Sequence, residues 1–110
     1  MLERAPSEAY EVIRQAIMQR RSLSGVYDES MRFFSPVSLG RCADGEPGVI
    51  AYQYAGRYPG GRQVPPGGSW ECFRLSRLRW LQPTADKWSI GPLGDKPNDF
   101  LKGSEVDAAA

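Results

Sequence analysis

The chain has 110 residues, of which 41% are hydrophobic and 25% charged, and its formal net charge is +1. This length supports one domain with a modest core, and the composition is typical of a folded globular protein. No apolar stretch approaches the roughly 20 residues that a membrane-spanning helix needs, and the N-terminal residues lack the apolar core of a signal peptide. We therefore expect a cytoplasmic protein.

Residues 7–22 are predicted to form a helix. Ser7 suits the N-cap position, and acidic residues follow it in the first turn. Arg20 and Arg21 fall in the expected last turn, where cations are favoured, and Gly25 is expected to end the helix. One apolar face recurs at helical spacing, made of Ala9, Tyr10, Ile13, Ala16 and Ile17.

The rest of the chain alternates short apolar stretches with Gly and Pro turns, which indicates strands. An irregularity near Ser76 is expected, because the alternation of side chains changes phase there. The sequence predicts a mainly β fold with one N-terminal helix (α+β), built as a strongly bent sheet or partly open barrel of four to five strands. The domain should span residues 7–92, and residues 93–110 should form a flexible tail. The expected strands are 23–27, 32–39, 49–54 and 70–81, with turns at 28–30 and 44–48 and an exposed loop at 59–69.

Arginine is concentrated in the middle of the chain. Residues 32–79 contain seven arginines and three acidic residues, a net charge of +4, whereas residues 95–110 contain four acids and two lysines. A guanidinium is a planar fork suited to phosphate or carboxylate, so this asymmetry points to an anion-facing surface. A preference for arginine that follows from a GC-rich genome would give the same composition.

The order of these pieces resembles a WYL domain over roughly residues 10–82. The match consists of Arg32 and Pro36 in one strand, the Ile50-Ala51-Tyr52 stretch, and the late strand segment Phe73-Arg74-Leu75-Ser76-Arg77-Leu78. The chain departs from the family at its naming tripeptide, because Pro47-Gly48-Val49 stands where Trp-Tyr-Leu is usual. Ser76 likewise stands where Asp is usual.

This resemblance implies an SH3- or Sm-like β-fold and a role in binding rather than catalysis. WYL domains usually follow a winged helix-turn-helix in bacterial transcription factors, where they are regarded as ligand sensors, and nucleic acids or nucleotides are the implied ligands. No DNA-binding domain fits before residue 7, so regulation would act through a partner protein or through free-standing sensing. Because of these departures, either the chain is a divergent member of the family or its ligand differs.

The expected ligand-binding residues are four arginines and one tyrosine: Arg74, Arg77, Arg32, Arg57 and Tyr52. The guanidinium groups would bind phosphate oxygens, and the tyrosine would offer a stacking surface. Salt bridges to Glu71 or to the helix are the structural alternative for Arg74 and Arg77. Trp70 and Trp80 are expected to pack in the core.

Nothing in the sequence indicates catalysis, a metal site or a cofactor. Histidine is absent, Cys42 and Cys72 form no C-x-x-C motif, and Asp28 and Glu29 are adjacent and suit a turn. The two thiols are expected to be reduced, with a disulfide between them as the alternative. We therefore expect a non-catalytic module that recognises an anionic ligand, a nucleic-acid strand or a nucleotide-like phosphate compound. The alternative is a protein-interaction or self-associating β-domain that forms a homodimer or binds a partner protein.

Overall fold

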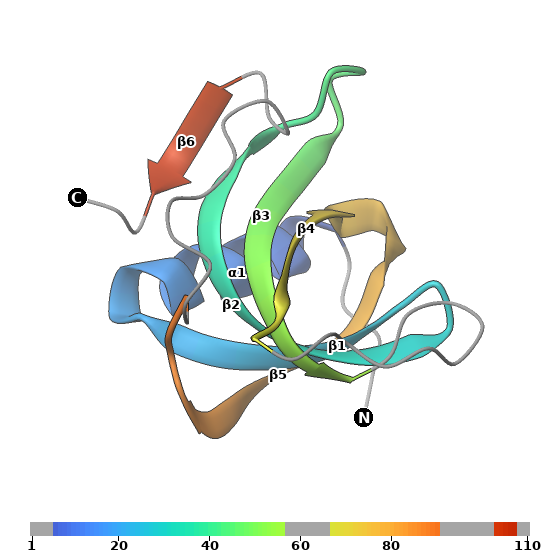
Figure 1. Ribbon diagram of the computed structural model, residues 1–110. Coiled ribbons are helices and arrows are strands. Elements are labelled where there is room, and N and C mark those ends of the chain that lie inside the picture. The colour runs from blue at the N-terminus through green and yellow to red at the C-terminus, as the bar shows by residue number, and fades with distance from the viewer. Residues whose placement is uncertain (1–5, 57–66, 91–102, 108–110) are drawn as a thin grey trace.

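The computed structural model describes residues 6–56, 67–90 and 103–107, which form one helix and an antiparallel sheet (Figure 1). The predicted combination of one N-terminal helix with a mainly β remainder is confirmed. No helix in these ranges has the length and apolar character needed to cross a membrane. In chain order the elements are α1 (Pro6–Gln19), β1 (Arg21–Tyr27), β2 (Ser30–Arg41), β3 (Pro47–Gly56), β4 (Ser69–Arg74), the 3₁₀ turn η2 (Leu75–Arg77), β5 (Leu78–Lys87) and β6 (Gly103–Asp107).

Helix α1 buries the apolar face that the sequence predicts, with Ile13 fully buried at its centre. It ends at Gln19, three residues before the predicted end, because Arg20 adopts a left-handed backbone conformation with φ 50°. Gly25, which was expected to end the helix, lies inside β1 instead. A Cβ at this position would come within 3.1 Å of the Leu81 side chain, so glycine allows β1 and β5 to approach closely.

The sheet has the strand order β4-β3-β2-β1-β5, and every pair is antiparallel. The two outermost strands, β4 and β5, are consecutive in the chain and are joined by η2 alone. This turn interrupts the predicted strand 70–81, so the expected irregularity near Ser76 is confirmed. Leu75 is buried within the turn and anchors it to the core.

Strand β6 lies within the segment that the sequence predicts to be a flexible tail. It pairs with the C-terminal half of β2, from Ser38 to Arg41, and Val106 packs against the main core. The Gly, Pro and charged residues around β6 give no local sequence signal for a strand. The strand forms by pairing with the C-terminal part of β2, which lies beyond the residues that pair with β1.

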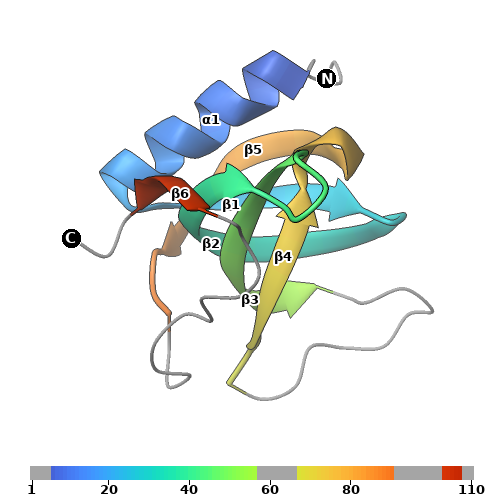
Figure 2. The ribbon, with the colours of Figure 1, turned by 90° about the horizontal axis from the view of Figure 1, so that it is seen from above.

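The core lies between α1 and one face of the sheet, and Figure 2 shows the helix lying across that face. Trp70 is partly buried against a small second cluster of Cys42 and Ile50. Trp80, which was expected in the core, is 37% exposed instead. Its positive φ of 58° coincides with a register shift between β1 and β5, and this bulge turns the side chain outward.

Candidate functional site

Three of the predicted ligand-binding arginines gather around one side chain, Tyr27 at the end of β1. The Cζ atoms of Arg32 and Arg77 lie 5.7 and 4.9 Å from the centroid of the Tyr27 ring. The backbone N–H of Arg74 donates to the Tyr27 hydroxyl at 3.2 Å. The fold therefore brings together arginines from β2, β4 and η2, and the tyrosine at their centre was not among the predicted site residues.

Arg32 is 2% exposed, so its guanidinium contacts the protein's own groups rather than solvent. One nitrogen donates to the side-chain oxygen of Gln53 at 3.0 Å, and another lies 3.4 Å from the Tyr27 carbonyl oxygen. The Phe73 ring lies 5.7 Å away. In this structure, Arg32 stabilises the packing beneath the arginine cluster and does not offer a surface for a ligand.

Arg74 and Arg77 are each paired with a carboxylate, but not with the partners expected from sequence. Arg74 pairs with Asp44 in the β2–β3 turn, and Arg77 pairs with Asp28 in the β1–β2 turn. The hydrogen bond that Arg77 donates to the Asp28 carboxylate raises the pKa of Arg77. The pKa of Asp44 is lowered, first by the backbone N–H of Glu46 and then by Arg74.

Tyr52 is buried, with 6% of its surface exposed, and donates from its hydroxyl to the Gly67 carbonyl at 2.6 Å. The backbone of Gly68 approaches the ring so closely that a Cβ there would lie 2.5 Å from it. Tyr52 therefore fixes the start of β4 in this structure, and its ring lies 6.2 Å from Trp70. Arg57, the remaining predicted site residue, lies outside the described residues.

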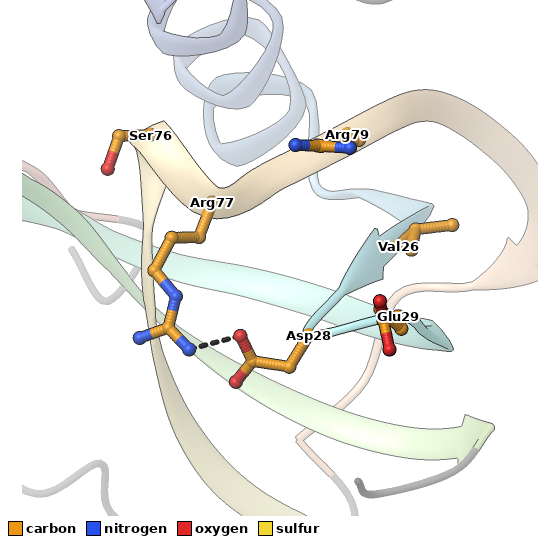
Figure 3. Close-up of a pocket in the computed structure, with 6 residues that line it drawn as sticks. All are labelled: Val26, Asp28, Glu29, Ser76, Arg77 and Arg79. Carbon is orange, nitrogen blue, oxygen red and sulfur yellow. Dashed lines mark hydrogen bonds and ion pairs between the residues drawn. The ribbon is translucent and has the colours of Figure 1, made fainter.

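Beside the arginine cluster is a cavity of about 300 Å³, which we call the hairpin pocket. Figure 3 shows Arg77 reaching from η2 toward Asp28 across this pocket. The described residues that line the hairpin pocket are Val26, Asp28, Glu29, Ser76, Arg77 and Arg79. Two guanidinium groups and two carboxylates thus share one cavity, and Arg79 joins Arg77 there although sequence reasoning did not select it.

The turn that carries the two carboxylates has an unusual backbone. Asp28 and Glu29 have φ values of 50° and 66° and form the whole connection between Tyr27 and Ser30, which are paired. Two-residue turns with positive φ at both positions favour Asn and Gly, and a non-glycine residue held there is strained. Strained turns are enriched at functional sites, and this one holds a carboxylate against Arg77.

The thiols of Cys42 and Cys72 are adjacent and hydrogen-bonded, and no disulfide joins them. Burial, followed by the neighbouring Cys42, raises the pKa of Cys72 to about 11. A thiol with this pKa is almost entirely protonated near neutral pH and is a poor nucleophile. No group of three or more metal-ligating side chains occurs within the described residues.

No protein-family model matches this chain, and no curated protein or solved structure gives a significant match.

Proposed function

We propose that this chain is a non-catalytic module that binds an anionic, phosphate-bearing ligand at the hairpin pocket. The observation that supports this proposal is that Arg77 and Arg79 line one cavity, with the Tyr27 ring beneath the Arg77 guanidinium. The Tyr27 ring orients the Arg77 guanidinium through a cation–π contact. An oriented guanidinium can bind a phosphate with two hydrogen bonds.

The Asp28 carboxylate occupies Arg77 in this structure, so a ligand must replace it. Both side chains are substantially exposed, at 50% for Arg77 and 32% for Asp28. An exposed ion pair contributes only about 0–1 kcal/mol, so exchanging its carboxylate costs little. A phosphate ester with up to two negative charges and three acceptor oxygens is a stronger partner than one carboxylate.

We further propose that the sheet is an SH3- or Sm-like, partly open barrel and that the chain is a divergent WYL domain. Support comes from the strand order, in which the outermost strands β4 and β5 are linked by one 3₁₀ turn. A link this short brings the two edges near each other at that point. A cytoplasmic sensor of nucleotides or nucleic-acid strands, acting in transcription regulation, is the role that this proposal implies.

The test is a titration with a short single-stranded oligonucleotide at several salt concentrations. Binding should weaken steeply as salt rises, because displaced counterions are released. Arg77→Ala should weaken it by about tenfold, since a hydrogen bond to a charged group is worth about 1.5–3 kcal/mol. Arg14→Ala is the matched control, because Arg14 pairs with Glu11 on the outer face of α1.

Asp28→Asn distinguishes this proposal from a site for cations or for ligands of mixed charge. Removing the competing carboxylate should strengthen oligonucleotide binding by a few-fold, since the lost ion pair contributes only about 0–1 kcal/mol. Weaker binding in Asp28→Asn, or binding unchanged by salt, would refute the anion-binding proposal.

A second candidate function is self-association through sheet edges. Strands β4 and β5 each pair on one side only within the described residues, and such edges can accept a strand from another chain. Two different edges would join head to tail and form rings or open chains of subunits. Light scattering that shows an oligomer insensitive to salt would favour this function, and a monomer at all concentrations would exclude it.

A further inference from the structure

A second cavity, of about 370 Å³, lies at the other end of the β1–β5 ladder, where α1 passes into β1. We call it the Trp88 pocket, and the lining residues that matter here are Arg20, Arg21, Thr84, Asp86, Lys87 and Trp88. Strand β1 runs seven residues between the two cavities, which separates them by about 20 Å. Among the residues that the structure describes, the two pockets share no lining residue.

Two cations of this pocket lie directly opposite each other. Arg21 is the register partner of Lys87 in the antiparallel β1–β5 pair, and both side chains are exposed. Like charges at such positions repel and destabilise the pair. Within the described residues neither side chain is in an ion pair, so no carboxylate bound directly to either cation offsets the repulsion. An anion placed between the two groups would remove it.

The aromatic wall of the pocket is fixed in place. The Trp88 indole N–H donates to the Pro36 carbonyl at 2.9 Å, and the next residue, Ser89, donates its backbone N–H to the Ser35 hydroxyl at 3.1 Å. The Arg20 guanidinium lies over the indole, with its Cζ 5.8 Å from the ring centroid. Trp88 and Arg20 therefore present a flat, pre-oriented surface beside the Arg21–Lys87 pair.

Arg20 has a left-handed backbone conformation that is unfavourable for a non-glycine residue, and its contact with Trp88 gives a reason for this conformation. Arg20 follows the last residue of α1 with φ 50°, a position where glycine is usual, and its N–H donates to the Ile17 carbonyl at 3.2 Å. The strained conformation directs a guanidinium onto the Trp88 ring, which a glycine could not supply.

One carboxylate, Asp86, also lines the pocket. It accepts a hydrogen bond from the Tyr54 hydroxyl at 2.8 Å, and its backbone N–H donates to the Thr84 hydroxyl at 3.2 Å. Burial is the main cause that raises the pKa of Tyr54, so the hydroxyl keeps its proton and continues to donate. Among the described lining residues, three cations against one carboxylate give a net charge of +2.

We propose that the Trp88 pocket binds a phosphate ester whose organic part is an aromatic ring, such as a nucleotide. The phosphate would lie between Arg21 and Lys87, and the ring would stack on the surface formed by Trp88 and Arg20. This binding site is distinct from the hairpin pocket, and neither proposal depends on the other. No covalent step is involved.

The experiment is a chemical-shift titration of the full chain with inorganic phosphate, glycerol phosphate, phenyl phosphate and adenosine monophosphate. Arg21→Ala and Lys87→Ala should each weaken phenyl phosphate binding by about tenfold, because each removes a charge-assisted hydrogen bond. Arg14→Ala, which removes the same charge elsewhere, should change binding by less than about twofold in moderate salt. Neither variant should unfold the protein, because each removes a repulsion.

Trp88→Leu tests the aromatic part separately. It should reduce the preference for phenyl phosphate over glycerol phosphate by about fivefold or more, since stacking is worth about 1–3 kcal/mol per ring. Inorganic phosphate should bind Trp88→Leu as it binds the wild type, which also shows that the variant is folded.

Equal effects of Arg21→Ala, Lys87→Ala and Arg14→Ala would overturn the proposal, as would phosphate-induced shifts confined to residues away from Arg21 and Lys87. A preference for phenyl phosphate that persists in Trp88→Leu would overturn its aromatic part. Comparing the affinities for adenosine monophosphate and for a short oligonucleotide distinguishes a free nucleotide from the end of a nucleic-acid strand as the ligand. Equal affinities indicate a small ligand, and tighter oligonucleotide binding indicates the end of a strand.

Discussion

The two pockets at the ends of the β1–β5 ladder contain the same kind of cation but differ in their counter-charges. In the hairpin pocket, Arg77 and Arg79 face two carboxylates on the strained turn. Among the described residues of the Trp88 pocket, three cations face one carboxylate, which accepts a hydrogen bond from Tyr54. The placement of acidic residues, more than the number of arginines, therefore decides where an anion meets excess positive charge.

This difference also separates two ways of binding. A ligand at the hairpin pocket, as proposed, would exchange with Asp28, so its affinity would be the difference between two similar interactions. A ligand at the Trp88 pocket, as proposed, would relieve the repulsion between Arg21 and Lys87, so it would add a favourable interaction without removing one. We expect the Trp88 pocket to bind simple phosphates more tightly than the hairpin pocket.

The largest expected effect concerns an arginine that belongs to neither pocket. Arg32→Ala should lower the free energy of unfolding by about 3 kcal/mol, because Gln53 loses its buried donor and a void opens beside Tyr27 and Phe73. Urea unfolding measures this loss. Arg79→Ala, at an exposed position, should change stability by less than about 0.5 kcal/mol. An Arg32→Ala protein as stable as the wild type but unable to bind phosphate would contradict the structural role of Arg32.

A charge reversal should have opposite effects on stability at the two ends of the ladder. Arg21→Glu places a carboxylate opposite Lys87, so it should raise stability by about 0.5 kcal/mol while abolishing phosphate binding at the Trp88 pocket. Arg77→Glu adds a third carboxylate to the hairpin pocket and should lower stability. Thermal unfolding of both variants, together with the phosphate titration, checks the comparison. A loss of stability in Arg21→Glu would show that Arg21 and Lys87 do not repel.

The last expected effect is a pH dependence at the thiol pair, whose two cysteines are not among the described lining residues of either pocket. The pKa of Cys72 is raised from its ordinary 9.0 to about 11, so the unfolded chain loses this proton at lower pH than the folded chain does. The resulting stabilisation is complete below about pH 9 and is lost as pH rises toward about 11. The stability difference between wild type and Cys72→Ala should therefore shrink between about pH 9 and about pH 11. A stability difference that grows as pH rises would contradict the raised pKa of Cys72.

The sequence predicted the elements whose signal is local. The apolar spacing around Ile13 and Ile17 defined the buried face of α1, and the β-branched and aromatic run from Val49 to Tyr54 defined β3. The phase change near Ser76 indicated the break between β4 and β5. Each of these features depends on residues within a few positions of one another.

The features that depend on pairing across the chain could not be predicted in this way. Arg21 and Lys87 oppose each other only because β1 and β5 align in one particular register, and Tyr27 becomes the centre of the arginine cluster for the same reason. The partners of Arg74 and Arg77 lie in turns that are distant in sequence, so their carboxylates could not be assigned beforehand. The resemblance to WYL domains stays a prediction.

The pairing of β1 with both β2 and β5 has a consequence for biosynthesis. β2 follows β1 after two residues and can pair with it within microseconds, whereas β5 begins about fifty residues later. At roughly 5–20 residues per second, a ribosome needs several seconds to deliver it. During that interval the outer edge of β1 is open to other chains. Because β1 and β5 both line the two cavities, the nascent protein would form the proposed binding sites only after β5 has been synthesised.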